Sequence, residues 1–321
     1  MKKRNKILVT GCAGFIGMHL CNKLLQLGYN VIGLDNLNDY YDVNLKIKRL
    51  SLLQNNPSFT FLKTDISNKD NLEDVFKNQK PSKVVNLAAQ AGVRYSLIDP
   101  HSYVESNIVG FMNILECCRH YDVEGLIYAS SSSVYGGNKK IPFSELDSVD
   151  NPISIYAASK KSNELMANSY NHLFGIRSTG LRFFTVYGPW GRPDMAMYIF
   201  ANKILKNEPI EVYNDGQMKR DFTFIDDIVD GIVLSIKKNY NKEVFNLGNN
   251  KPENLMDIVS MIEKKIGKKA KVLFKPMQLG DVEKTYADIE SAKEKLGYSP
   301  IIDVQEGIDK FIDWFLVSSH R

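Results

Sequence analysis

KILVTGCAGFIGMHLCNKLLQLGYNVIGLD, residues 6–35, carries the strongest structural signal in the chain. Its first five residues are an apolar, β-prone run, which predicts a buried strand. Residues 19–27 then carry apolar side chains at helical spacing, and Gly28 provides a helix stop. A second β-prone run at 30–35 completes a strand–helix–strand unit. These residues therefore predict the first unit of a parallel sheet.

The same alternation continues along the chain. Further strands are predicted at 59–63, 83–88, 125–130 and 177–183, and further helices at 70–77, 101–120 and 156–174. Alternating strands and helices predict an α/β fold, a Rossmann-type doubly wound parallel sheet covered on both faces. After residue 180 the elements become shorter and mixed. We therefore expect a Rossmann domain over 1–180 and a smaller mixed α/β domain for the substrate over 181–321, with some segments returning to the first domain.

Three glycines, Gly11, Gly14 and Gly17, separate the first strand from the first helix. Glycine permits a tight turn and lets backbone N–H groups approach a pyrophosphate, which the helix N-terminus also attracts. Asp35 ends the second strand, where a carboxylate can accept both hydroxyls of an adenosine ribose and would repel a 2′-phosphate. The pattern therefore predicts NAD rather than NADP. Asp65, after the third strand, is expected at the adenine edge.

Tyr156 and Lys160 are four residues apart on a predicted helix and therefore share one face. A lysine ammonium and the positive nicotinamide ring would both lower the pKa of the phenol, which is ordinarily about 10. The phenolate could then act as a general base on a sugar hydroxyl. We also expect Lys160 to bind the nicotinamide ribose.

Four consecutive serines, residues 130–133, follow the strand at 125–130. Hydroxyl groups at the carboxyl end of a buried strand are costly unless they form hydrogen bonds. That end of an open α/β sheet is also where ligands bind. The serine loop is therefore a second candidate ligand contact.

Composition excludes several other classes of protein. The 321 residues carry a net charge of +4 with both signs mixed, which is not typical of a nucleic-acid-binding surface. No apolar stretch is long enough to predict a membrane span, so we expect no membrane insertion. The four cysteines, at 12, 21, 117 and 118, have neither metal-ligand nor disulfide spacing. We therefore expect no metal site and a reducing, cytoplasmic location.

Together, the glycine turn, the serine loop and the Tyr-x-x-x-Lys pair resemble the extended short-chain dehydrogenase/reductase family over nearly the whole chain. Within that family the sequence is most similar to the UDP-glucuronate 4-epimerases. The matching segments are DNLNDYYD (35–42), AAQAGVRY (88–95), SSSSVYG (130–136), YAASKK (156–161), LRFFTVYGPWGRPDM (181–195) and KRDFTFIDD (219–227).

The resemblance implies a 4-keto mechanism, in which C4 of a UDP-sugar is oxidised, the sugar swings, and C4 is reduced from its other face. Ser131 would be the hydroxyl partner of Tyr156, with Lys160 beside them. The implied cofactor contacts are Gly11, Gly14, Phe15, Ile16, Gly17, Asp35, Asn36, Asp65, Ile66, Ala88, Ala89, Gln90, Asn107, Tyr156 and Lys160. The implied substrate contacts are Arg94, Ser131, Ser132, Ser133, Thr185, Arg192, Arg220, Gln278 and Asp281. Related galactose epimerases have an arginine near position 278, so a diphosphate contact there is in doubt.

Two residues distinguish between the reactions that this fold supports. Relatives that dehydrate the sugar carry Asp and Glu at the positions of Ser132 and Ser133, and relatives that decarboxylate it carry Glu at the position of Ser133. Serine is a poor general acid or base. A 4-keto uronate readily loses CO₂ unless its carboxylate is held, and the planar fork of Arg192 suits that task. We therefore expect interconversion of UDP-glucuronate and UDP-galacturonate. The alternatives are a 4-epimerase of a neutral or N-acetylated UDP-sugar, a decarboxylase or dehydratase, and a non-catalytic NAD-binding protein.

The predicted helices at 101–120 and 156–174 would flank the sheet on one side. In relatives these helices pair with their copies, so we expect a homodimer. The apolar residues Phe111, Ile114, Leu115, Leu165 and Met166 could serve that interface or the core.

Overall fold

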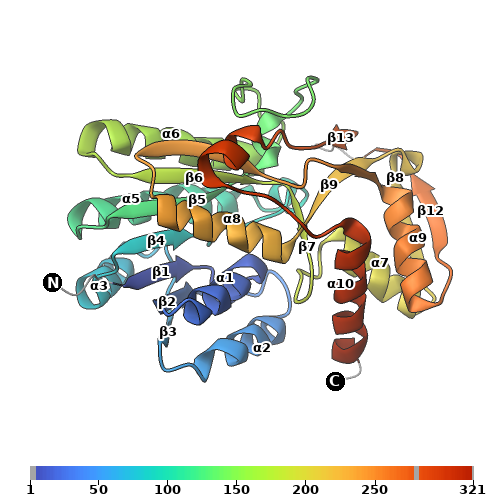
Figure 1. The fold of residues 1–321 in the computed structure, drawn as a ribbon, viewed down its shortest axis with the longest axis horizontal. Coiled ribbons are helices and arrows are strands. Elements are labelled where there is room, and N and C mark those ends of the chain that lie inside the picture. Colours follow the sequence, from blue (N-terminus) through green and yellow to red (C-terminus); the bar gives the residue numbers. More distant parts are fainter. Residues whose placement is uncertain (1–4, 278–281, 320–321) are drawn as a thin grey trace.

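Seven parallel strands form the central sheet in the computed structural model, which describes residues 5–277 and 282–319 (Figure 1). Their order is β10-β6-β5-β4-β1-β2-β3. The strands are β1 (Lys6–Thr10), β2 (Asn30–Asp35), β3 (Phe59–Lys63), β4 (Lys83–Asn86), β5 (Gly125–Ser131), β6 (Ser178–Phe183) and β10 (Lys242–Leu247). Parallel register is continuous across the sheet, with Leu8 opposite both Ile32 and Val84. The predicted Rossmann-type fold is confirmed.

Helices cover both faces of this sheet (Figure 1). One face carries α1 (Phe15–Gln26), α2 (Val43–Gln54) and α8 (Ile225–Lys238). The other carries α3 (Lys69–Gln79), α5 (Gly110–His120) and α6 (Ile155–Phe174). In β1, Ile7 and Val9 pack toward one face and Leu8 toward the other, because successive side chains of a strand alternate. Burial on both faces explains why the strands are continuous apolar runs.

Helix α6 is delimited by local signals at both ends. Ser154 accepts a hydrogen bond from the backbone N–H of Ala157, which caps the first turn. Gly175, with φ of 70°, ends the helix in the left-handed conformation that glycine tolerates. Tyr156 therefore lies in the first turn, at the end of α6 nearest the carboxyl edge of the sheet.

Three helices differ from the prediction. Helix α1 begins at Phe15, directly after Gly14, instead of residue 19. The helix predicted over 101–120 consists of α4 (Pro100–Tyr103), a wider π-helical segment η2 (Val104–Val109) and α5. Helix α2 was not predicted at all, because two of its four buried residues are the cations Lys46 and Arg49. Their charge masks the apolar periodicity by which an amphipathic helix is recognised.

The remaining chain forms two smaller sheets beside the first (Figure 1). One contains β7 (Thr185–Tyr187), β9 (Lys219–Phe224), β11 (Pro252–Asn254) and β13 (Lys284–Thr285), and the other contains β8 (Pro209–Tyr213) and β12 (Lys271–Lys275). Helices α7 (Ala196–Leu205), α9 (Leu255–Ile266) and α10 (Val304–Ser319) lie against them. Strand β10 and helix α8 nevertheless belong to the large sheet, so the chain crosses back after residue 224.

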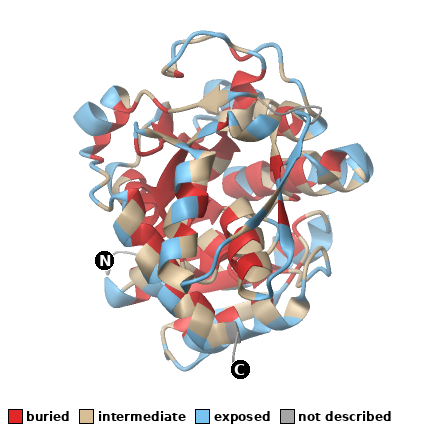
Figure 2. Ribbon diagram, turned by 90° about the vertical axis from the view of Figure 1, so that its right-hand side faces the viewer, coloured by how far each residue is buried: buried red, intermediate tan, exposed pale blue. Residues whose placement is uncertain are grey.

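Buried residues concentrate along the strands and on the helix faces turned toward them (Figure 2). Phe111, Ile114 and Leu115 of α5 belong to this core, while Leu165 of α6 is 55% exposed. Within residues 5–277 and 282–319, no helix is long and apolar enough to cross a membrane. The same residues contain no cluster of His, Cys, Asp or Glu side chains suited to hold a metal ion.

Candidate functional site

A cavity of about 790 Å³ opens at the carboxyl ends of the central strands, between the large sheet and the segments after residue 183. Ligands of open α/β sheets bind at this edge. All but three of the predicted site residues line it. Asn107 lies behind the wall, where its side-chain amide bonds to the backbone N–H and C=O of Gln90. Gln278 and Asp281 lie outside the described residues.

The backbone around the glycine turn is packed so closely that a Cβ on Gly11 or Gly17 would clash with neighbouring backbone atoms. Gly11 has φ of 70°, and a Cβ there would lie 2.9 Å from the backbone nitrogen of Ala88. A Cβ on Gly17 would lie 2.0 Å from the carbonyl oxygen of Gly11. The first turn of α1 therefore packs directly on the strand-to-helix loop, and its N-terminus faces the cavity. This is the cradle that a dinucleotide pyrophosphate requires.

Asp35 lies at the cavity wall beside this turn. The backbone N–H groups of Leu37 and Ala13 donate to its two oxygens over 2.9 and 3.1 Å. Burial raises the pKa of Asp35, while these hydrogen bonds and the charge of Lys46 oppose the rise. Lys46 also lines the cavity and was missed by the sequence analysis, since α2 itself was not predicted. The glycine turn and the neighbouring Asp35 carboxylate fit the binding of NAD.

Gly17→Ala is expected to weaken NAD binding by at least about tenfold, or about 1.4 kcal/mol. The new methyl group would displace the Gly11 carbonyl and with it the turn. Titration calorimetry of cofactor-stripped protein measures this directly. Gly137→Ala is the matched control, because the nearest atom to its Cβ is 4.0 Å away. Equal NAD affinity in the two variants would contradict the assigned role of the turn.

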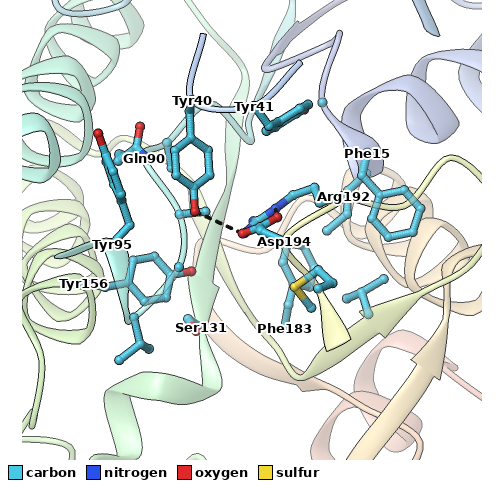
Figure 3. Close-up of a pocket in the computed structure, with 18 of the residues that line it drawn as sticks. Phe15, Tyr40, Tyr41, Gln90, Tyr95, Ser131, Tyr156, Phe183, Arg192 and Asp194 are labelled. Atoms are coloured by element: carbon cyan, nitrogen blue, oxygen red, sulfur yellow. Dashed lines mark hydrogen bonds and ion pairs between the residues drawn. The ribbon is translucent and has the colours of Figure 1, made fainter. Parts of the chain in front are cut away.

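Tyr156, Ser131 and Lys160 all line the cavity, and Figure 3 shows Tyr156 and Ser131 on one side of it. Burial raises the pKa of the Tyr156 phenol, and a hydrogen bond from Ser131 and the positive charge of Arg192 partly offset this. Lys160 is 3% exposed and donates to the carbonyl of Ala129 over 2.9 Å. Burial lowers its pKa to about 8. The predicted lowering of the tyrosine pKa therefore does not arise in the protein by itself.

A buried ion pair stabilises the serine loop, residues 130–133. Arg182 of β6 binds both carboxylate oxygens of Glu164, each over 2.9 Å. Ser130 donates to the same carboxylate over 2.6 Å, and Arg182 also donates to the hydroxyl of Tyr135. The sequence does not reveal this network, because nothing in the pattern around Glu164 distinguishes it from a polar residue on the exposed face of a helix. It holds the end of β5, and so the position of Ser131.

Arg192 faces the same cavity, but part of its guanidinium group is already bound. Its Nε and Nη2 donate to the two carboxylate oxygens of Asp194 over 2.9 and 2.5 Å. The hydroxyl of Tyr40, from the loop after β2, donates to the same carboxylate over 3.0 Å (Figure 3). Tyr40 and Asp194 lie in segments that matched the family pattern, yet neither was predicted as a site residue. The guanidinium group of Arg192 therefore has one edge, formed by Nε and Nη2, that binds Asp194, and an outer edge, formed by Nη1 and Nη2, that does not.

A fully buried cation anchors the loop that carries Arg192. Arg49 of α2 donates to the carbonyls of Trp190 and Gly191 and, on its other side, to the carbonyl of Ala13 in the glycine turn. Trp190 has a φ of 63°, a conformation that costs a non-glycine residue of order 1 kcal/mol or more. Arg49 therefore ties the cofactor turn to the Arg192 loop and stabilises its unusual backbone.

The other predicted cations lie at the mouth of the cavity. The guanidinium group of Arg94 lies 4.8 Å from the centre of the Tyr213 ring, across from β8. Arg220 of β9 donates to the carbonyls of Lys219 and Glu283 over 2.9 and 3.0 Å. Thr185 begins β7 and lines the wall below. The structure thus brings Arg94, Thr185 and Arg220 to the wall of one cavity.

Comparison with known proteins agrees with this arrangement. The model of the NAD dependent epimerase/dehydratase family matches residues 7–248. UDP-glucuronate 4-epimerase 4 of Arabidopsis thaliana is 47% identical over 97% of this chain and 75% of its own. Among solved structures, UDP-glucuronic acid 4-epimerase of Bacillus cereus, in complex with UDP-glucuronic acid and NAD, is 38% identical, with a TM-score of 0.91 over 98% of this chain and 99% of its own. UDP-glucose 4-epimerase of Thermotoga maritima, with UDP-glucose, is 33% identical with the same TM-score and coverage.

Proposed function

The chain belongs to the NAD dependent epimerase/dehydratase family, and we propose that it interconverts UDP-glucuronate and UDP-galacturonate by inverting C4 through a 4-keto intermediate. The observation that carries this proposal is that Arg192 and Tyr156 line the same cavity, so that the cation faces the site of the base. A cation in this cavity suits a sugar with a carboxylate on C5, next to the reacting carbon. The relatives named for UDP-glucuronate support the same choice.

The reaction needs a base that takes the C4 hydroxyl proton and later returns one. When bound, NAD supplies the hydride acceptor and donor for C4. Tyr156 is the base, and Ser131 stabilises its phenolate by hydrogen bonding. Burial keeps the pKa of the Tyr156 phenol high, and the positive charge of bound NAD would lower it. Lys160, held by the Ala129 carbonyl, would bind the cofactor ribose.

The sugar pocket must also protect the keto-uronate. We assign the C6 carboxylate to Arg192 and Thr185, and the diphosphate to Arg220, with Arg94 near the cavity mouth. Ser132 and Ser133 line the sugar and, being hydroxyls, cannot supply the acid and base that dehydration needs. Both serines lie at the cavity wall, in keeping with this assignment.

Proton NMR of purified protein incubated with UDP-glucuronate tests the function. Signals of UDP-galacturonate are expected, with NAD added in a parallel sample. A pentose product would mean a decarboxylase. No change with UDP-glucuronate, together with turnover of UDP-glucose or an N-acetylated UDP-sugar, would favour a 4-epimerase of those sugars, a function to which the Thermotoga relative points.

Three broader assignments complete the proposal. The chain forms a homodimer through η2 and α6, an idea supported by the exposed apolar side chains Val104, Val109, Leu165 and Leu173 on those elements. It works in the cytoplasm, which agrees with four buried, unpaired cysteines. Residues 1–180 bind chiefly NAD, and residues 181–321 bind chiefly the nucleotide sugar.

A further inference from the structure

We propose that Asp194 and Tyr40 form a positioning pair that fixes which edge of the Arg192 guanidinium group meets the substrate carboxylate. By doing so, the pair keeps the keto-uronate from losing CO₂. This inference rests on the proposed function and adds two residues to it. Neither residue touches the reacting atoms; both act through Arg192.

The donors of Arg192 set the geometry. A guanidinium group has five N–H bonds, and Asp194 accepts one from Nε and one from Nη2. The edge formed by Nε and Nη2 is therefore closed to the substrate. What remains is the outer edge, with both hydrogens of Nη1 and the second hydrogen of Nη2. A substrate carboxylate can be bound in two-point fashion only along this edge, which restricts the direction of the sugar's C5–C6 bond.

Asp194 is itself held in place. Burial alone would raise its pKa, but the hydrogen bond and charge of Arg192 lower the pKa below its usual range, so the group is an ionised acceptor. Burial and the neighbouring Asp194 raise the pKa of Tyr40 to about 12, so its hydroxyl stays a donor. The carboxylate thus receives two hydrogen bonds from Arg192 of its own loop and one from Tyr40 of the loop after β2.

Three loops meet at this point: those that follow β2 and β4 of the large sheet and the one that follows β7 (Figure 3). The Tyr40 ring lies 4.8 Å, centre to centre, from that of Tyr95. A Cβ added to Gly92 would lie 3.1 Å from the Tyr40 hydroxyl and 3.8 Å from both Arg192 Nη2 and Asp194 Oδ2. Close packing against the 88–95 segment leaves the Tyr40–Asp194–Arg192 group little freedom to rearrange. The orientation of Arg192 is therefore built into the protein before the substrate arrives.

The chemistry explains why orientation matters. After oxidation at C4, breaking the C5–C6 bond releases CO₂ and leaves its electron pair on C5, delocalised onto the C4 oxygen as an enolate. A proton then adds to C5, and the product is a 4-keto-pentose nucleotide. This bond breaks fastest when it stands perpendicular to the plane of the ketone. An arginine that is free to turn would admit such a conformation, whereas one with a single accessible edge can exclude it.

The test compares Tyr40→Phe and Asp194→Asn with the unmodified protein. Proton NMR of reactions with UDP-glucuronate and NAD gives the ratio of pentose to galacturonate nucleotide. We expect the ratio to rise about tenfold in Asp194→Asn, which loses one of two charged hydrogen bonds to Arg192, and about threefold in Tyr40→Phe. Tyr240→Phe is the matched control: its hydroxyl donates to the carbonyl of Lys295 at the protein surface, away from the cavity, so the ratio should not change.

Binding provides a readout independent of turnover. In a Tyr156→Phe background, calorimetry is expected to show a several-fold loss of affinity for UDP-glucuronate in both variants and no loss for UDP-glucose. If total rate falls but both the product ratio and this selectivity stay unchanged, the pair is merely structural and the inference is overturned. Absence of any UDP-galacturonate from the unmodified protein would instead refute the proposed function, and the control reaction separates the two results.

Discussion

Tyr156→Phe is expected to lower kcat with UDP-glucuronate by about 1,000-fold, the size of a general base's contribution. The substitution removes the hydroxyl that exchanges a proton with the C4 oxygen and leaves the ring in place. Because the Tyr156 ring stays in place and only one of many cofactor and substrate contacts is lost, affinities for NAD and UDP-glucuronate should stay within about threefold. Stopped NMR reactions give kcat, and calorimetry gives the affinities.

Tyr170→Phe is the matched control for this variant. It lies on the same helix, but its hydroxyl binds Glu116 at the helix surface, away from the cavity. It should keep nearly full activity. If Tyr156→Phe retained a comparable rate, another group would have to be the base, and the reading of the Tyr156–Ser131 pair would be wrong.

The second large effect is expected at Arg192. In Arg192→Ala, kcat/KM for UDP-glucuronate should fall by about 100-fold, because a charged two-point hydrogen bond to the carboxylate is lost. The same parameter for UDP-glucose should change little, so that the preference for uronate over neutral sugar collapses. A panel of the two substrates measures this preference, and the pentose fraction is read from the same spectra.

Arg192→Lys refines this experiment. It keeps the charge that faces Asp194 but lacks the planar fork, so we expect it to retain part of the affinity and little of the selectivity. Arg177→Ala controls for the loss of an exposed arginine, since Arg177 precedes β6 at the opposite edge of the sheet. An unchanged uronate preference in Arg192→Ala would remove Arg192, and with it the Tyr40–Asp194 pair, from the specificity mechanism.

The two predictions depend on different parts of the molecule. Tyr156 sits in the first turn of α6, whose ends are set by Ser154 and Gly175 within the same segment. Arg192 depends on contacts from distant segments: Arg49 donates to Trp190, 141 residues away, and Tyr40 donates to Asp194, 154 residues away. Local signals thus sufficed to place Tyr156 at the start of α6, while the setting of the arginine depends on tertiary packing.

The amino-acid sequence by itself determined the Rossmann-type sheet, the NAD turn and the Tyr156–Lys160 pair. Each follows from short-range patterns: alternating strands and helices, glycines where no Cβ fits, and helical spacing of two functional groups. For the same reason the strands up to residue 183 were located to within a few residues.

Only the tertiary structure decided the return of β10 to the large sheet, the existence of α2 with its buried cations, and the closed edge of Arg192. Lys46 and Arg49 read as surface charges until their partners are known, because a buried cation is recognised by the carbonyls around it and not by its neighbours in sequence. Likewise, Arg192 carries the right fork for a carboxylate, but which edge is free depends on Tyr40 and Gly92, brought to it by the packing of three strands' loops. The type of a residue determines which groups its side chain can bind. Contacts between distant segments determine which of its donors and acceptors remain available for a ligand.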